Sequence, residues 1–283
     1  MIPAAFDYVA PNSIAEALAA LREGGDEAKV LAGGQSLLPV LRLRMAAPTL
    51  LVDLSKVEEL RGIRQEGDKI VVGAMTTHHD VIENPLVRQH LSLLAKTTEQ
   101  VADPQVRYRG TLGGALAHAD PAGDLGAVTV ALDAEMRISG PNGSRTVPAQ
   151  EFFTDYFTTA LEDDELLTAI AFDSYAGWGA HYEKFHTVSQ AWSTVAVAAA
   201  VLAGGGSVMT ARVALTNMGA TPIRARAVER ALEGGLATDE AVRAAAQAAT
   251  EGTSPVDDAT APAAYRSHLA QVLTSRAVLA AVS

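Results

Sequence analysis

The sequence predicts an α+β protein with two domains. Short apolar runs, which are typical of buried strands, alternate with helical patterns over the first 175 residues. The last third shows two long strand patterns around a glycine turn and then three helical patterns. A chain of 283 residues can form more than one hydrophobic core. We therefore expect one domain at 1–175, with a small lobe at 1–55 and a larger lobe at 56–175, and a second domain at 176–283.

The small lobe is expected to be an α/β unit. Ser13 and Glu16 form a capping box, which predicts that a helix with an apolar face begins here. The apolar runs at 29–32 and 50–54 have the length of buried strands. A short helix is predicted at 37–43, because a proline is tolerated in the first turn of a helix.

The larger lobe mixes both kinds of element. We expect strands at 69–73 and 166–172 and helices at 77–82 and 91–101. Residues 135–147 alternate in polarity around a Pro-Asn-Gly sequence, which predicts a β-hairpin.

The second domain is expected to combine antiparallel strands with helices. Strands at 194–203 and 208–216 flank Gly204–Ser207, which we interpret as a hairpin turn. A phosphate-binding loop is a poorer interpretation, because neither a helix nor a lysine follows these glycines. Three helices should follow, beginning at Thr221-Pro222, at Thr238-Asp239 and at Pro262, and ending at Gly234-Gly235, at Gly252 and near Val282.

Composition narrows the classes of function. The net charge of −11 argues against a nucleic-acid partner and against direct binding to anionic membranes. No apolar run has the length of a membrane span, and the N-terminal residues lack the pattern of a signal peptide, so we expect a cytoplasmic protein without membrane insertion. The chain has no cysteine, which excludes disulfides, thiolate zinc sites and cysteine-held iron–sulfur clusters within it.

Two glycine-rich turns indicate a ligand with phosphates. They are Ala32–Ser36 and Thr111–Ala115. Glycine lets a backbone approach a ligand closely and adopt positive φ, so each turn can direct several N–H groups at an anion. Two such cradles suit a dinucleotide. Their spacing differs from the single-turn G-x-G-x-x-G fingerprint of nicotinamide Rossmann domains.

These turns and their neighbours carry a family resemblance. The residues that carry it are Ala32–Ser36, Asp103–Arg107, Thr111–Gly114, Asp120-Pro121, Asp124, Glu165–Ile170, Tyr182–Lys184 and Ala214–Asn217. In this order they resemble the FAD-binding (medium) subunit of the molybdenum hydroxylase and xanthine dehydrogenase family. Gly73–Thr77 and Tyr156–Thr158 are most similar to the aerobic carbon monoxide dehydrogenase branch. The resemblance implies a two-lobed FAD-binding domain of the vanillyl-alcohol-oxidase (PCMH-like) type. A C-terminal domain with a three-stranded antiparallel sheet and a three-helix bundle would follow it.

The resemblance also implies which residues bind FAD. Ala32–Ser36 would wrap the pyrophosphate, and Asp124 would bond ribityl or ribose hydroxyls. Leu167 and Lys184 would line the adenine and isoalloxazine ends, where a cation favours anionic reduced flavin. The full expected set is Lys29, Val30, Leu31, Ala32, Gly33, Gly34, Gln35, Ser36, Leu37, Ala102, Thr111, Leu112, Gly113, Gly114, Ala115, Asp120, Asp124, Leu167, Lys184 and Trp192. No catalytic or metal-binding residue is expected on this chain.

Two positions depart from the family pattern. Ala115 stands where the family often has Asn, so one side-chain hydrogen bond near the flavin would be missing or replaced by water. Gln190-Ala191-Trp192 stands where the family often has Gly-Asp-Tyr. We expect Trp192 to cover the flavin ring with its larger π-face in place of that tyrosine.

Plainer interpretations exist for several of these residues. A Gly-Gly pair before a helix is often only a turn, Lys184 alone suits a solvated surface, and Asp120 suits a helix N-cap. Trp192 suits a core aromatic under the C-terminal sheet. His78 and His79 point to different sides of any regular element and suit surface or cap positions. A metal site from His118, Asp120 and Asp124 matches no common ligand spacing.

The function implied by the resemblance is electron transfer. Electrons would come from [2Fe–2S] clusters of a small subunit, after a substrate reacts at a molybdopterin centre in a large subunit, and would leave from FAD to an acceptor such as a quinone. The assembly would be a dimer of heterotrimers (a heterohexamer), and its partners would account for any peripheral attachment to the inner face of the cell membrane. Arg42 and Arg44 are candidates for partner contact.

Three alternatives remain open. The first is a flavin subunit of an N-heterocycle hydroxylase acting on nicotine, quinoline or caffeine. The second is a self-contained FAD oxidoreductase, and the third is an acidic scaffold that has lost its cofactor.

Overall fold

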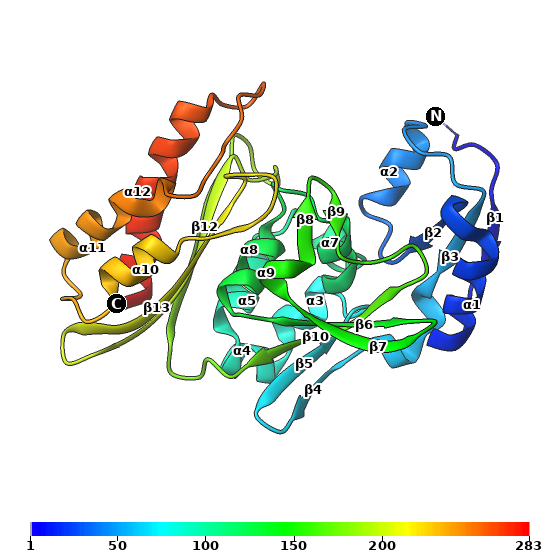
Figure 1. Ribbon diagram of the computed structural model, residues 1–283, viewed down its shortest axis with the longest axis horizontal. Coiled ribbons are helices and arrows are strands. Elements are labelled where there is room, and N and C mark those ends of the chain that lie inside the picture. The colour runs from blue at the N-terminus through cyan, green and yellow to red at the C-terminus, as the bar shows by residue number, and fades with distance from the viewer. Residues whose placement is uncertain (1, 283) are drawn as a thin grey trace.

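Three of the four sheets, each with its own helices, lie side by side along the length of the molecule, and the fourth is a small two-stranded sheet (Figure 1). The computed structural model of the chain describes residues 2–282. The small lobe lies at one end, the larger lobe in the middle, and the C-terminal sheet with its helices at the other end. The predicted division at residue 175 falls between the last strand of the larger lobe and the first strand of the C-terminal sheet.

The small lobe is a parallel three-stranded sheet in the order β1-β3-β2. The Ser13 side chain accepts a hydrogen bond from the N–H of Glu16, so the predicted capping residue does start the first helix. Ala17 and Leu21 on this helix pack against Val52 of the sheet. The elements are β1 (Asp7–Val9), α1 (Ile14–Gly24), β2 (Ala28–Leu31), α2 (Leu37–Arg42) and β3 (Leu50–Asp53).

The larger lobe is an antiparallel five-stranded sheet in the order β4-β5-β10-β6-β7. Its helices pack on the face that carries Val72, Ile170 and Phe172, and these residues belong to the largest core cluster. The strands are β4 (Ile63–Glu66), β5 (Lys69–Gly73), β6 (Glu135–Gly140), β7 (Gly143–Pro148), β10 (Leu166–Asp173) and a separate pair, β8 (Phe153–Asp155) and β9 (Thr158–Thr159). The helices are α3 (His78–Glu83), α4 (Pro85–His90), α5 (Ser92–Glu99), α6 (Pro104–Arg107), α7 (Leu112–His118), α8 (Asp124–Ala131) and α9 (Ala149–Phe152).

The C-terminal sheet has four strands in the order β11-β12-β13-β14, so the expectation of three was wrong. The additional strand, β14 (Ile223–Arg224), pairs with Ala214 and Leu215. Because Thr221-Pro222 lead into this strand, the next helix begins at Arg226 and not at Thr221. The elements are β11 (Gly179–Phe185), β12 (Val195–Gly204), β13 (Ser207–Thr216), β14, α10 (Arg226–Leu232), α11 (Asp239–Ala246) and α12 (Ala263–Val282).

Strand β12 belongs to two hydrophobic cores. Val197 and Val201 face the core formed with helices α10, α11 and α12. Ala196, Ala198 and Ala200 face helices α5 and α8 of the larger lobe. A strand that is buried on both faces is uniformly apolar, which explains the long apolar run in the sequence.

None of the helices in the described residues is long and apolar enough to span a membrane.

We predict that Ala198→Leu destabilises the protein. Ala198 is fully buried between β12 and the helices of the larger lobe, so the larger side chain must displace a close-packed neighbour. Overpacking of this kind costs about 1–3 kcal/mol in the free energy of unfolding. Urea unfolding measures the change. Met209→Leu, at an exposed position of β13, is the control and should leave the midpoint unchanged. An Ala198→Leu protein as stable as the wild type would contradict the packing described here.

Candidate functional site

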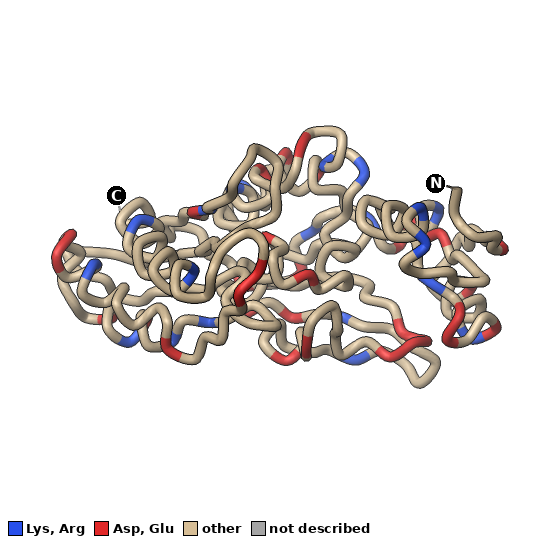
Figure 2. The backbone as a smooth tube through the Cα atoms, turned by 90° about the horizontal axis from the view of Figure 1, so that it is seen from above, with Lys and Arg blue, Asp and Glu red and all other residues tan. Residues whose placement is uncertain are grey.

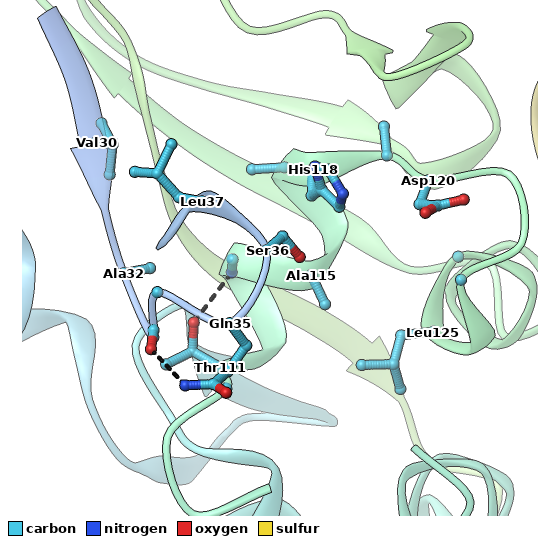
Figure 3. Close-up of a pocket in the computed structure, with 18 of the residues that line it drawn as sticks. Val30, Ala32, Gln35, Ser36, Leu37, Thr111, Ala115, His118, Asp120 and Leu125 are labelled. Atoms are coloured by element: carbon cyan, nitrogen blue, oxygen red, sulfur yellow. Dashed lines mark hydrogen bonds between the residues drawn. The ribbon is translucent and has the colours of Figure 1, made fainter. Parts of the chain in front are cut away.

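A cavity of about 620 Å³ lies between the small lobe, helices α7 and α8, and the start of the C-terminal sheet. Figure 3 shows Gln35 and Ser36 of the first glycine turn facing Thr111 and Ala115, with Leu125 across the opening. A cavity of this size lies in the range of small-molecule and cofactor sites.

The first glycine turn connects β2 to α2 and has the properties of an anion cradle. A Cβ on Gly33 would lie 2.2 Å from the carbonyl oxygen of Arg109, and Gly34 has a φ of +77°. Glycine is therefore required at both positions. Within residues 2–282, no hydrogen bond uses the backbone N–H groups of Gly34, Gln35 or Ser36. Such a set of free N–H groups can hold the oxygens of a pyrophosphate.

The second glycine turn differs from the prediction, because its N–H groups are already used. Leu112 donates to the carbonyl of Thr76 at 3.0 Å and Gly113 donates to that of Ala74 at 2.8 Å. Gly114 donates to the Thr111 hydroxyl at 3.1 Å, while Ala115 donates to the Thr111 carbonyl at 3.0 Å. The turn caps α7 and forms a wall of the cavity, but it does not offer a second row of free donors.

The glycines of this second turn serve close packing instead. A Cβ on Gly113 would lie 2.5 Å from the Cβ of Ala74, and one on Gly114 would lie 3.1 Å from the Cβ of Ala32. Gly113 therefore lets α7 pack against Ala74 within the larger lobe, and Gly114 lets Ala32 of the small lobe approach α7.

A second set of donors comes from the start of α8. Asp120 caps the preceding turn and not the helix, since its carboxylate accepts the N–H of Ala122 at 2.9 Å. Helix α8 begins after Gly123 without a side-chain cap, and Gly123–Gly126 line the cavity. The uncapped N-terminus adds the positive end of a helix dipole to the site.

A buried polar cluster around Asp124 closes one wall. Its Oδ1 accepts hydrogen bonds from the hydroxyls of Tyr182 at 2.7 Å and Ser193 at 2.8 Å. Its Oδ2 accepts one from Lys184 Nζ at 2.8 Å, and both charged side chains are almost completely buried (5% and 3% exposed). Lys184 is thus not a solvated surface residue. Neither Tyr182 nor Ser193 was among the expected site residues, although Tyr182 belongs to the motif Tyr182–Lys184 that carries the resemblance.

Burial and the neighbouring Asp124 charge raise the pKa of Tyr182 well above its usual value. The hydroxyl therefore stays protonated and remains a hydrogen-bond donor to the carboxylate.

His78 lies inside the cavity wall, so the expectation of a surface or cap position was wrong. Its side chain is buried, and its Nδ1 has no hydrogen-bond partner among the described residues. Burial, with a smaller contribution from Arg107, lowers the pKa of His78 to about 4. The neighbouring His79 lies on another side of the helix and stacks on Tyr108. Only one of two adjacent helical residues can face the core, but the sequence does not say which.

Trp192 lines the cavity and is 57% exposed, so it is not a core aromatic. Gln190, two residues before Trp192, has a φ of +70° and also lines the cavity. That Trp192 covers a flavin ring stays a prediction.

The cavity brings together all but four of the expected FAD-binding residues. Leu31, Leu112, Gly113 and Leu167 do not line it. Leu31 packs beneath Gly34, and Leu167 is buried in β10 opposite Ile138 of β6. The residues that do line it are Lys29, Val30, Ala32, Gly33, Gly34, Gln35, Ser36, Leu37, Ala102, Thr111, Gly114, Ala115, Asp120, Asp124, Lys184 and Trp192.

Charges of both signs are spread along the chain. Figure 2 shows no segment in which Lys and Arg dominate. Within the described residues, no group of three or more His, Cys, Asp or Glu side chains is arranged to hold a metal ion.

Comparison with known proteins places the chain in a family. The model of the FAD-binding domain in molybdopterin dehydrogenase matches residues 4–172, and that of the CO dehydrogenase flavoprotein C-terminal domain matches residues 180–281. The chain therefore belongs to the FAD-binding medium subunits of the molybdenum hydroxylases, which are oxidoreductases. Its first domain is the two-lobed FAD-binding domain of the PCMH type.

Individual relatives agree with this assignment. The carbon monoxide dehydrogenase medium chain of Hydrogenophaga pseudoflava is 43% identical over 282 residues, covering 99% of this chain and 98% of the relative. A solved carbon monoxide dehydrogenase from the same organism matches with a TM-score of 0.97 at 45% identity, covering 100% of this chain and 99% of that one. Quinoline 2-oxidoreductase from Pseudomonas putida 86 matches with a TM-score of 0.95 at 34% identity, covering 99% of this chain and 98% of that one.

We predict that His78 contributes to acid sensitivity. Its pKa is about 4 in the folded protein and about 6.5 in the unfolded chain, so the unfolded chain takes up the proton first. The free energy of unfolding should therefore fall by about 3 kcal/mol through this residue between pH 6.5 and 4. In His78→Gln that part of the pH dependence should disappear, as measured by urea unfolding across this range. His79→Gln is the control and should keep the wild-type slope. If the slope in His78→Gln equals that of the wild type, His78 takes up a proton as readily in the folded protein as in the unfolded chain, and the prediction is wrong.

Proposed function

We propose that the cavity binds FAD and that the chain is the electron-transfer subunit of an aerobic carbon monoxide dehydrogenase. The observation that carries the proposal is the first glycine turn, whose free N–H groups and closely packed glycines suit a pyrophosphate. The uncapped start of α8 adds the positive end of a helix dipole, and the ammonium of Lys184, which is paired with Asp124, adds an N–H donor. The cavity volume suits a dinucleotide.

The residues proposed to hold FAD follow from these donors. Gly34, Gln35 and Ser36 would bond the pyrophosphate. Lys184 would lie next to the isoalloxazine, and Trp192 would cover one of its faces. Bound FAD supplies one- and two-electron redox chemistry, and a fixed cation beside it favours the reduced anion. The proposal needs no general base on this chain, because the substrate would react on another subunit.

The proposed partners are those that the family implies. Relatives of this chain are medium chains, so [2Fe–2S] centres would come from a small subunit and molybdopterin from a large subunit. The absence of cysteine agrees with this, because cysteine-ligated clusters need thiolates from another chain. Electrons would pass from those clusters to this subunit and then to an external acceptor such as a quinone. The proposed assembly is a dimer of heterotrimers in the cytoplasm, with any attachment to the inner face of the cell membrane made through partners.

A partner surface is proposed around Arg42 and Arg44 at the end of α2. Leu43 and Met45 beside them are 59% and 74% exposed. Apolar side chains next to cations are common at the centres of protein interfaces.

A second candidate is the flavin subunit of an N-heterocycle hydroxylase. It is favoured by the match to quinoline 2-oxidoreductase and by 38% identity to a caffeine dehydrogenase subunit beta from Pseudomonas sp. CBB1. The two candidates share the same flavin site, because the substrate would bind to another chain.

Isolation of the native complex tests the proposal. The chain should co-purify under mild conditions with two further chains, molybdenum, iron and flavin, and carbon monoxide should bleach the flavin absorbance. Bleaching by an N-heterocycle, and not by carbon monoxide, would favour the second candidate. A lone yellow protein without metals would contradict the subunit assignment and favour a self-contained oxidoreductase.

We further predict that Gly33→Ala loses FAD. The new Cβ would lie 2.2 Å from the Arg109 carbonyl, so the glycine turn must move away from the larger lobe. We expect the dissociation constant for FAD to rise at least about tenfold, which corresponds to about 1.4 kcal/mol, and the purified protein to carry less flavin. Gly235→Ala, where the nearest atom would be 3.2 Å away and outside the cavity, should retain full flavin content. Equal flavin in both variants would contradict the role given to the turn.

A further inference from the structure

The cluster around Asp124 joins the two domains at the cavity wall. Asp124 is the first residue of α8 in the FAD-binding domain. Its three hydrogen-bond donors come from the C-terminal domain: Tyr182 and Lys184 on β11, and Ser193 just before β12. The carboxylate is buried, and both of its oxygens accept hydrogen bonds, which is the condition under which a buried charge is tolerated.

Lys184 is oriented by this carboxylate. An ammonium group has three N–H bonds. One is directed at Asp124 Oδ2 at 2.8 Å, and one at the carbonyl of Gln100 at 3.3 Å. Within residues 2–282 the third has no acceptor, and Lys184 lines the cavity. The direction of that third bond therefore depends on where Asp124 is held.

Tyr182 and Ser193 hold Asp124 without reaching the cavity themselves. Both hydroxyls donate to Oδ1, while Lys184 takes Oδ2, so the carboxylate cannot rotate without breaking a hydrogen bond. Neither residue lines the cavity, and their side chains are almost completely buried. Any effect that they have on a ligand must pass through Asp124 and Lys184.

The backbone around these hydroxyls is fixed independently. The N–H of Ser193 donates to the carbonyl of Ala122 at 3.4 Å, and that of Asn217 donates to the carbonyl of Pro121 at 2.9 Å. The Asn217 side chain also donates to the carbonyl of Ser193 at 2.8 Å. Removing only a hydroxyl therefore leaves the two domains attached at the loop that precedes α8.

We propose that Tyr182 and Ser193 are positioning residues for FAD, which hold Asp124 so that it aims the free N–H bond of Lys184 at the bound cofactor. The proposal rests on the proposed function, because it takes FAD as the occupant of the cavity. It adds that the C-terminal domain controls the flavin through hydroxyl groups that never touch it.

The test uses the full chain with FAD removed and added back. In Tyr182→Phe the dissociation constant for FAD, followed by flavin fluorescence, should rise about tenfold, because a hydrogen bond to a buried charge is lost. In an Asp124→Asn background the same substitution should change it less than about twofold, because the group through which Tyr182 acts is altered. Ser193→Ala should behave like Tyr182→Phe, and it provides a second measurement if Tyr182→Phe does not fold.

The midpoint potential of the bound flavin provides a readout that packing alone would not move. Tyr182→Phe should lower it, by about 30 mV for each tenfold loss in the binding of reduced relative to oxidised flavin. Tyr175→Phe is the matched control. Tyr175 is a half-buried tyrosine near the charged groups of Arg212 and Asp133, and it does not line the cavity. It should keep the wild-type affinity and potential.

The outcomes separate the two proposals. If the wild-type chain binds no FAD, the proposed function fails. If the wild type binds FAD but Tyr182→Phe has an equally large effect with and without the Asp124→Asn substitution, or is matched by Tyr175→Phe, the positioning role is overturned while the proposed function stands. A loss that requires the carboxylate of Asp124, together with a lower potential, supports the positioning role.

Discussion

The cavity depends on the close approach of two backbones that have no side chains between them. Gly33 lies against the carbonyl of Arg109, and Gly114 lies against Ala32. These contacts set the small lobe against α7 and leave the first glycine turn with its N–H groups free. The two glycine-rich turns look equivalent in the sequence but have different roles. The first presents free N–H groups to the cavity, and the second lets the small lobe approach α7 so that these N–H groups face the cavity.

The far wall is held by electrostatics and not by close packing. A buried carboxylate at Asp124 is stable only because the C-terminal domain delivers a cation and two hydroxyls to it. The site is consequently shared between the domains, and neither domain alone contains the complete set of cavity residues. The exposed Trp192 near the end of the connection to β12 belongs to the same shared wall.

Local signals in the sequence predicted the elements that local physics decides. The capping residue Ser13, the Pro-Asn-Gly hairpin and the first glycine turn were each visible because the residues that fix them are neighbours in the chain. The two-residue strand β14 was missed, because it exists only through pairing with β13.

The roles of single side chains in the site were harder to predict, since they depend on contacts between distant residues. The N–H groups of the second turn are used by the carbonyls of Ala74 and Thr76, which belong to another segment. Tyr182 meets Asp124 across 58 positions of sequence, and no local pattern marks that pair. His78 and His79 are adjacent, yet only the packing of α3 decides which of them is buried.

Strand β12 links the cores of the two domains, because each of its faces belongs to one of them. One face of the strand, with its valines and Ala199, completes one core, and the other face, with Ala196, Ala198 and Ala200, completes the other. Neither core can therefore open without exposing one apolar face of this strand to water. The boundary that divides the chain by sequence is therefore not a boundary for cooperative unfolding. We therefore expect the amide protons of β12 to be among those that exchange most slowly with solvent, although the strand itself does not line the cavity.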